Sequence, residues 1–279
     1  MKFFIFLIVF FRCFYEAIEI PEVPKSEIEA LQSFFFSTNG PFWVKNDGWD
    51  IFLNSSAPMT NPCDLSSTWF GIECIYIENI TSHISTISLM QNKLSSSYFP
   101  SKALSNLTQL IQLDLSSLID SKSHNENMLY GSIQEICHLN SNLQVLSLSN
   151  NYLYGEFPSC IGHALSNLSY INFAYNQING TTPSSICSLS SLITFDMKET
   201  SMTGSIPKCI GNQLSELKLL NYENINSGGI SLTGGIPNTL CNLKKLETLN
   251  LGILNKKKIS FCNLHMFFEL NDFFFFFEI

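Results

Sequence analysis

Apolar and polar residues alternate along most of the chain in blocks of about 25 residues, a period typical of proteins built from stacked structural repeats. In one block, apolar residues stand at the first, fourth and sixth positions of the run Leu143-Gln-Val-Leu146-Ser-Leu148. The same run recurs at 168–173, 192–197 and 217–222, with earlier copies at 84–94 and 110–115 and a seventh that begins at 246. Because side chains two apart on a strand share a face, each run predicts a short strand with one buried face.

A Gly-x-x-Pro element follows the strand in four blocks, at 155–158, 180–183, 204–207 and 234–237. An asparagine also follows several runs, and we expect Asn92, Asn151 and Asn176 to turn inward and hydrogen-bond backbone groups of neighbouring coils, since buried polar groups need such partners. A single block cannot bury its own apolar face, so the blocks must stack into a solenoid with one continuous core.

The resulting run, Leu-x-x-Leu-x-Leu-x-x-Asn-x-Leu-x-Gly-x-Ile-Pro, resembles the plant-type leucine-rich repeat of receptor kinases, receptor-like proteins and polygalacturonase-inhibiting proteins. The resemblance covers about residues 80–254, or about seven repeats. It implies an α/β solenoid: a right-handed superhelix with a concave parallel β-sheet, a second short strand at the Leu-x-Gly element, and 3-10 or short helices on the convex side. Similar repeats occur outside plants, so the organism is not identified.

Residues 25–79 resemble the helical N-terminal cap of these proteins, which covers the exposed end of the first coil. The segment starts with a helical pattern at Glu27 and continues through Trp43 and Trp49 to Cys63 and Cys74. The family resemblance implies a disulfide between these two cysteines. A metal site is disfavoured because the chain lacks the Cys-x-x-Cys and His-x-x-x-His spacings, and we predict neither metal nor cofactor.

The internal cysteines alternate between two local contexts from coil to coil. Cys137 and Cys160 are 23 residues apart, and Cys187 and Cys209 are 22 apart, which is one coil in each case. Stacking would bring each pair together on the convex face, so we predict two disulfides there. The alternative is that these cysteines are small buried apolar side chains. Cys241 and Cys262 hint at a third pair in a degenerate further coil.

The N-terminal segment and the glycosylation sequences indicate export. Residues 1–17 read as a signal peptide, since Lys2 is followed by an apolar stretch over 3–11 that is too short to span a bilayer. Residues 255–279 are apolar but interrupted by acidic residues, so we interpret them as a degenerate or artefactual tail and not as a membrane span. Five Asn-x-Ser/Thr acceptors are present, at Asn54, Asn79, Asn106, Asn167 and Asn179.

Charge and motifs exclude several function classes. The net charge of −8 argues against nucleic acid as a partner, since its binding requires clustered Lys and Arg. The chain has no dinucleotide-binding glycine pattern, no phosphate-binding loop and no Gly-x-Ser-x-Gly elbow, and its histidines are scattered. We therefore predict that the protein is not an enzyme.

A ligand is expected on the concave sheet, where side chains that point away from the core are free to bind. The candidates are Gln112, Asp114, Val145, Ser147, Tyr170, Asn172, Tyr175, Thr194, Asp196, Lys198, Asn221 and Glu223. For any one of them, a solvated strand face is the simpler interpretation. Two longer coils, with inserted residues at 120–128 and 224–231, either mark a binding edge or are tolerated loops.

Taken together, these features predict an extracellular recognition module of receptor-like type, secreted or held at the cell surface. Its partners would be a peptide, glycan or protein ligand on the concave face, with a co-receptor as a further partner. Two alternatives remain: a secreted inhibitor of cell-wall-degrading hydrolases, and a truncated fragment without function.

Overall fold

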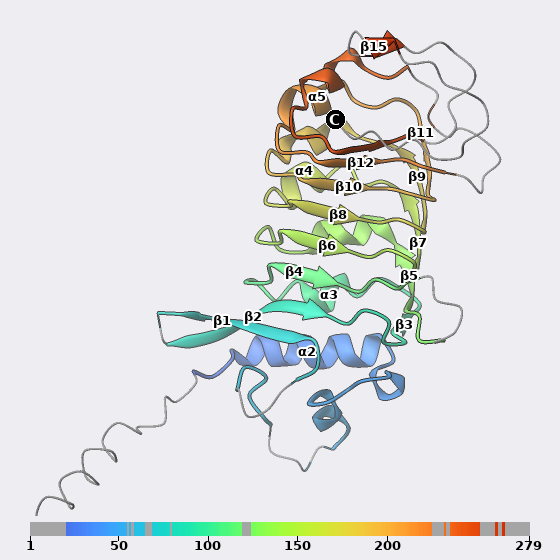
Figure 1. The fold of residues 1–279 in the computed structure, drawn as a ribbon. Coiled ribbons are helices and arrows are strands. Elements are labelled where there is room, and N and C mark those ends of the chain that lie inside the picture. The colour runs from blue at the N-terminus through green and yellow to red at the C-terminus, as the bar shows by residue number, and fades with distance from the viewer. Residues whose placement is uncertain are drawn as a thin grey trace, which may run out of the picture.

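The computed structural model describes residues 21–54, 56, 59–64, 69–78, 80–118, 124–224, 232 and 235–251, with the backbone of 260–261 and 264–265. The expected signal peptide, Asn79, Cys262, most of the tail and parts of both long coils lie outside these residues. The described chain winds into a stack of coils with strands on one side and short helices on the other (Figure 1). This is the leucine-rich-repeat solenoid that the repeats predict.

One sheet of eight strands runs the length of the stack, in the order β1-β2-β4-β6-β8-β10-β12-β13. β1 and β2 form an antiparallel pair, and each later strand joins in parallel, one per coil. The strands span Ile72–Ile77 (β1), Thr81–Ser88 (β2), Gln112–Asp114 (β4), Val145–Ser147 (β6), Tyr170–Asn172 (β8), Thr194–Asp196 (β10), Leu219–Asn221 (β12) and Thr248–Asn250 (β13).

A second, five-stranded parallel sheet forms at the Leu-x-Gly elements, as the family resemblance implies, in the order β11-β9-β7-β5-β3. Its strands span Ser95–Ser96 (β3), Met128–Ser132 (β5), Tyr152–Glu156 (β7), Gln177–Thr181 (β9) and Ser201–Thr203 (β11). The central residue of each repeat motif, such as Leu153 or Ile178, is buried, while its two neighbours face outward. The second sheet therefore has an open outer face.

Short helices complete the coils on the convex side: Ser101–Leu104 (α3), Ile133–His138 (η3), Ile161–Ala164 (α4), Ser184–Ser188 (η4), Cys209–Gln213 (α5) and Asn238–Asn242 (η5). Glycine permits close packing at alternate junctions. A Cβ on Gly162 would collide with the carbonyl oxygen of Ser185 in η4, and one on Gly211 would collide with that of Thr239 in η5. The repeated Cys-Ile-Gly sequence thus places its glycine where the next coil packs most closely.

The predicted asparagine ladder is present inside the solenoid. Nδ2 of Asn151 donates to the carbonyls of Leu115 and Leu148, at 3.0 and 3.1 Å, while its Oδ1 accepts from the backbone N–H of Leu129 at 3.0 Å. Asn176 repeats these contacts one coil later. In the second coil Asn127, near the end of the inserted residues 120–128, takes the ladder position and bonds five backbone groups. The insertion therefore leaves the core ladder continuous.

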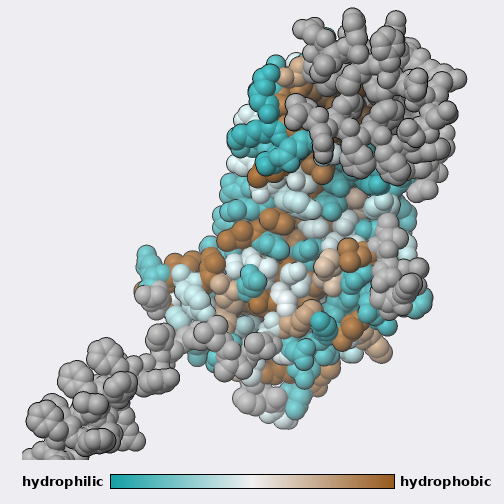
Figure 2. Space-filling model, in the orientation of Figure 1, coloured by the Kyte–Doolittle hydropathy of each residue, from teal (hydrophilic) through white to brown (hydrophobic). Residues whose placement is uncertain are grey.

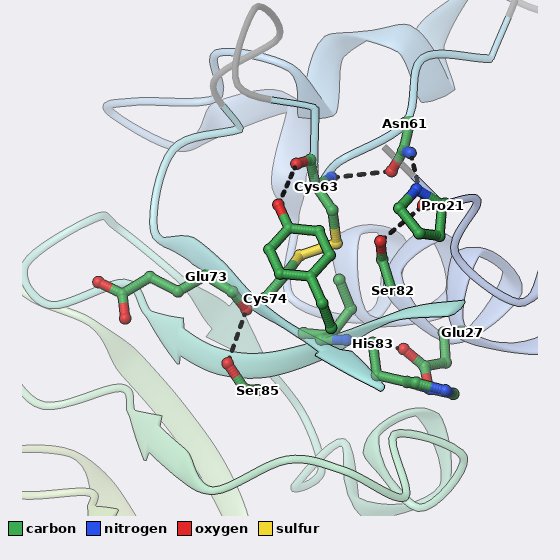
Figure 3. Close-up of a disulfide and its surroundings, with 11 residues drawn as sticks. Pro21, Glu27, Asn61, Cys63, Glu73, Cys74, Ser82, His83 and Ser85 are labelled. Carbon is green, nitrogen blue, oxygen red and sulfur yellow. Dashed lines mark hydrogen bonds and ion pairs between the residues drawn. A yellow bond between two sulfur atoms is a disulfide. The ribbon is translucent and has the colours of Figure 1, made fainter. Parts of the chain in front are cut away.

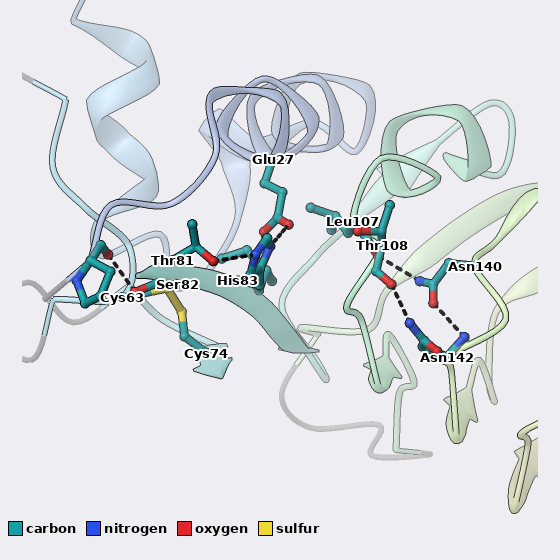
Figure 4. A network of polar contacts seen from close by, with 12 residues as sticks. Glu27, Cys63, Cys74, Thr81, Ser82, His83, Leu107, Thr108, Asn140 and Asn142 are labelled. Carbon is teal, nitrogen blue, oxygen red and sulfur yellow. Dashed lines mark hydrogen bonds and ion pairs between the residues drawn. A yellow bond between two sulfur atoms is a disulfide. The ribbon is translucent and has the colours of Figure 1, made fainter. Parts of the chain in front are cut away.

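The N-terminal cap combines helix α2 (Lys25–Ser37) with the short turns η1 (Gly40–Phe42) and η2 (Trp49–Leu53). Phe34 and Phe35 of α2 pack with Trp43, Trp49 and other rings into an aromatic core. The carboxylate of Glu27, which is buried, accepts hydrogen bonds from Nδ1 of His83 at 2.6 Å and from the backbone N–H of Ile84 at 2.8 Å (Figures 3 and 4).

Side-chain amides also tie the coils together at the turns that precede the concave strands. Nδ2 of Asn140 donates to the carbonyl of Leu107, and Nδ2 of Asn142 donates to that of Thr108, each in the coil before (Figure 4). Near the C-terminal end, strands β14 (Ser260–Phe261) and β15 (Leu264–His265) pair antiparallel with each other and form a sheet of their own. In the part of the chain that the structure describes, no helix is long and apolar enough to cross a membrane.

Candidate ligand-binding site

A straight row of side chains crosses the concave sheet because its parallel strands pair without a shift in register. We call it the concave row; each member is half-buried: Thr86, Gln112, Val145, Tyr170, Thr194, Leu219 and Thr248. With strands about 4.8 Å apart, the row is about 29 Å long. Within the described residues, the side chains of Gln112, Tyr170 and Thr194 make no hydrogen bond, so they are available to a ligand.

The residue two positions after the row member has a structural role in four of the strands, which the sequence interpretation missed. Oδ1 of Asp114, Asn172, Asp196 and Asn221 accepts a hydrogen bond from the backbone N–H two residues further on, at 3.0–3.1 Å. Such turns, formed by an Asp or Asn side chain with its own backbone, end each strand. These four side chains therefore stabilise the turns at the ends of their strands, and each has one oxygen already hydrogen-bonded.

Three candidates expected to face solvent are in fact buried: Ser147, Asn221 and Glu223. For Glu223 the reason is its neighbour in the preceding coil. Its carboxylate lies 2.6 Å from Nζ of Lys198, and only 4% of the Glu223 side chain is exposed. The lysine compensates the buried negative charge of Glu223.

Lys198 is the centre of a polar cluster on the concave face that also contains Tyr175, Asp196 and Glu223. Nζ of Lys198 lies 5.9 Å from the centre of the Tyr175 ring, a cation–π distance. Burial disfavours the charge on Lys198, but its hydrogen bond and attraction to Glu223 outweigh burial and leave the pKa of Lys198 raised. Burial raises the pKa of the Asp196 carboxyl, only partly offset by its hydrogen bond from the Lys198 backbone.

Tyr175 has an unusual backbone conformation for a bulky residue. Its φ is 55°, in the left-handed region, as are those of Gln91, Asn150 and Glu199 at the equivalent position of other coils. Asn tolerates this conformation well, whereas an aromatic side chain is uncommon there. The recurrence of this φ in four coils shows that the turn of the repeat requires it, and Tyr175 is the aromatic residue among the four.

The predicted cysteine pairs are bonded in the structure. Cys63–Cys74 links the cap to β1, with Cα atoms 5.7 Å apart (Figure 3). Cys137–Cys160 and Cys187–Cys209 each link two consecutive coils on the convex side, with Cα separations of 6.0 and 5.8 Å. Cys241 is also disulfide-bonded, and its predicted partner Cys262 lies outside the described residues.

Four of the five glycosylation acceptors lie in the described part of the chain, and all four are exposed: Asn54, Asn106, Asn167 and Asn179. Asn179 differs from the others because it lies within a strand, β9, on the outer face of the second sheet. That face also carries exposed Met128, Tyr130, Tyr152 and Tyr154, which the sequence interpretation did not single out. These four side chains point outward because they flank the buried Leu129 and Leu153.

The face of the stack seen in Figure 2 is chemically mixed. Polar and apolar residues alternate over the coils in the view of Figure 2. Among the described residues, no group of three His, Cys, Asp or Glu side chains is placed to hold a metal ion. Shallow, chemically mixed surfaces of this kind suit recognition of another molecule.

The fold is a leucine-rich-repeat solenoid, and known proteins of this fold match the chain in sequence and in structure. The family model described as Leucine Rich Repeat matches residues 142–164 and 167–189. Receptor-like protein 1 of Arabidopsis thaliana is 30% identical over 129 residues, which cover 46% of this chain. The match spans only 10% of the length of that relative.

Solved structures of plant receptor kinases share the fold. The crystal structure of Pollen Receptor Kinase 3 is 28% identical, with a TM-score of 0.59, and the match covers 78% of this chain and 90% of that one. The receptor kinase HAESA of Arabidopsis, solved with the peptide hormone IDA and the co-receptor SERK1, is 22% identical with a TM-score of 0.61. That match covers 82% of this chain and 33% of HAESA.

Proposed function

We propose that the protein is a non-catalytic extracellular recognition module that binds an extended peptide, or an extended segment of a protein, along the concave row. The observation that carries the proposal is the alignment of half-buried side chains in step across seven parallel strands. A row of about 29 Å matches about nine residues of extended chain, at about 3.3 Å per residue.

The chemistry of the row favours a peptide over a glycan or a highly charged partner. Val145, Tyr170 and Leu219 offer apolar contacts, and the side chains of Gln112 and Thr194 offer hydrogen bonds. A row that combines apolar and hydrogen-bonding positions suits a peptide, which presents both side chains and backbone amides. Lys198, beside the row, is paired with Glu223, and Lys218, which precedes Leu219, is paired with Glu247, so neither lysine offers an uncompensated positive charge to a polyanion.

The bound peptide hormone of HAESA offers a precedent at the level of the fold. The three coil-linking and cap disulfides and the exposed glycosylation acceptors support an extracellular setting for this chain. A co-receptor would need a further surface, and the edge that carries the two longer coils is the natural place for it.

Thr194→Arg tests the proposal, because it places a long charged side chain in the middle of the row without touching the core. The secreted protein is incubated with the peptide fraction of extracellular fluid, and the retained peptides are identified by mass spectrometry. Gln213→Arg, at an exposed position of α5 on the convex side, is the matched control.

We expect the wild type and Gln213→Arg to retain the same peptides and Thr194→Arg to lose them at least tenfold. Equal retention by all three proteins would contradict binding along the row. Retention of a cell-wall hydrolase in place of peptides, with inhibition of its activity, would favour the inhibitor function.

A further inference from the structure

The outer face of the second sheet presents a cluster of aromatic side chains with nothing packed on them. Tyr130, Tyr152 and Tyr154 are 47%, 50% and 39% exposed, and Met128 beside them is 48% exposed. The strands pair in step, with Tyr130 opposite Tyr152, and the rings of Tyr130 and Tyr154 lie 4.8 Å apart. We call these three tyrosines the tyrosine face. Neighbouring exposed rings at this density usually mark a surface that something covers.

The surroundings of the tyrosine face are polar but almost uncharged. On the next strands, β9 and β11, the outward side chains are Gln177, Asn179, Thr181, Ser201 and Thr203. Among the outward residues of β5, β7, β9 and β11, Glu156 alone carries a charge. Aromatic rings flanked by amides and hydroxyls match a neutral sugar, whose C–H faces pack on rings while its hydroxyls hydrogen-bond at the margin.

A glycan attached to this same face is the nearest source of such sugars. Asn179-Gly180-Thr181 is a glycosylation acceptor, and the Asn179 side chain is exposed. In the register of β7 and β9, Tyr154 is opposite Gln177 and Glu156 is opposite Asn179. Tyr154 is thus a diagonal neighbour of Asn179 on the same face, about 7–8 Å away between Cα atoms.

We propose that Asn179 carries an N-linked glycan whose first sugars pack on the tyrosine face. In the attachment step a lipid-linked oligosaccharide diphosphate donates its sugar chain. Nδ2 of Asn179 loses a proton and bonds to the anomeric carbon, the sugar–phosphate bond breaks, and the lipid diphosphate leaves. The inference depends on passage through the secretory pathway and not on the concave row, so failure of ligand binding leaves it intact.

The other acceptors are placed differently. Asn106 and Asn167 lie in turns that follow α3 and α4, and Asn54 follows η2 in the cap. Only Asn179, among these described acceptors, lies on a strand of the sheet that carries the three tyrosines. A glycan at Asn167 is therefore the matched control, with the same chemistry at a site away from the tyrosine face.

The experiment compares secreted wild type with Asn179→Gln, Thr181→Val, Thr181→Ser and Asn167→Gln. Glycopeptide mass spectrometry reads occupancy, and mild iodination followed by peptide mapping reads the modification rates of Tyr130, Tyr152 and Tyr154 against that of Tyr76 in β1. We expect Asn179 to be occupied in the wild type and in Thr181→Ser, which keeps the acceptor sequence.

In Asn179→Gln and Thr181→Val, the iodination rates of the three tyrosines should rise several-fold while that of Tyr76 stays constant. Asn167→Gln should leave all four rates unchanged. An unmodified Asn179 in protein glycosylated elsewhere, or equal iodination rates with and without the Asn179 glycan, overturns the inference. Absence of glycan at every acceptor overturns it together with export.

Discussion

Nζ of Lys198 lies 2.6 Å from Oε2 of Glu223, across two adjacent coils of the concave sheet. This contact fixes the orientation of the lysine beside Tyr175 and Asp196, and so shapes one side of the concave row. It also explains how a glutamate that was expected in solvent can be buried. The pair therefore links the stacking of the coils to the chemistry of the ligand surface.

Lys198→Ala should destabilise the fold, since it leaves the buried Glu223 carboxylate without its cation. The expected cost is about 1–3 kcal/mol of unfolding free energy, at the lower end because Lys198 itself is partly exposed. Lys198→Met combined with Glu223→Leu should recover most of the loss. Denaturant unfolding measures both. Lys245→Ala, which breaks the more exposed pair with Glu216, should change the stability by less than about 0.5 kcal/mol.

Asp196→Asn should raise the stability at neutral pH. Burial raises the pKa of Asp196 in the folded state above 3.8, so the native protein favours the protonated carboxyl. Protonation of Asp196 therefore stabilises the folded state. This stabilisation is fully present below pH 3.8 and is lost as the pH rises through the pKa of Asp196 in the folded state. Asn keeps the oxygen that accepts from the Lys198 N–H and carries no charge.

The measurement is the melting temperature as a function of pH. The advantage of Asp196→Asn over the wild type should be largest near pH 7 and shrink as the pH falls towards 4. Asp114→Asn, at the equivalent turn of β4, controls for the loss of a carboxylate away from Lys198. If the difference in melting temperature between Asp196→Asn and the wild type became smaller as the pH rose, the raised pKa of Asp196 would be contradicted.

Tyr175→Asn should make the protein more stable and a poorer binder. Asn adopts the left-handed conformation at lower cost, as Asn150 does one coil earlier, so we expect a gain of about 0.5–1 kcal/mol after loss of the Lys198 contact. If the tyrosine is retained for recognition, ligand affinity falls in the same variant. Unfolding and binding are measured on one preparation, and unchanged affinity would assign Tyr175 no role in recognition.

Gly162→Ala should disrupt the junction between α4 and η4. The added Cβ collides with the backbone carbonyl of Ser185, which no rotamer change can relieve, so we expect a loss of about 1–3 kcal/mol or more. Gly235→Ala is the control, because a Cβ there meets no atom within 4 Å. Equal melting temperatures for the two variants would show that the coils separate readily at this junction.

Much of the fold follows from periodicity, and the exceptions have specific physical causes. The spacing of Leu143, Leu146 and Leu148 predicts the strand and its buried face, and the spacing of Cys137 and Cys160 predicts their bond. Periodicity cannot distinguish an outward Asp that binds solvent from one that accepts a hydrogen bond from its own backbone, as Asp114 does. Such a bond depends on local turn geometry.

Contacts between coils explain the remaining differences. Glu223 is buried because Lys198 belongs to the coil before, and no pattern within one repeat contains that pair. Asn127 takes the ladder position although the insertion shifts it along the sequence relative to Asn151 and Asn176, so the repeat spacing does not point to it. The glycines at 162 and 211 likewise owe their role to the following coil.

The most direct test of recognition along the concave row is site-specific photo-cross-linking. A benzophenone amino acid is placed at position 170, in the middle of the row, and in a second protein at position 163 on the exposed side of α4. Each protein is irradiated with the peptide fraction of extracellular fluid. The account predicts peptide adducts from position 170 and none above background from position 163. Adducts from position 163 alone, or equal adducts from both positions, would contradict it.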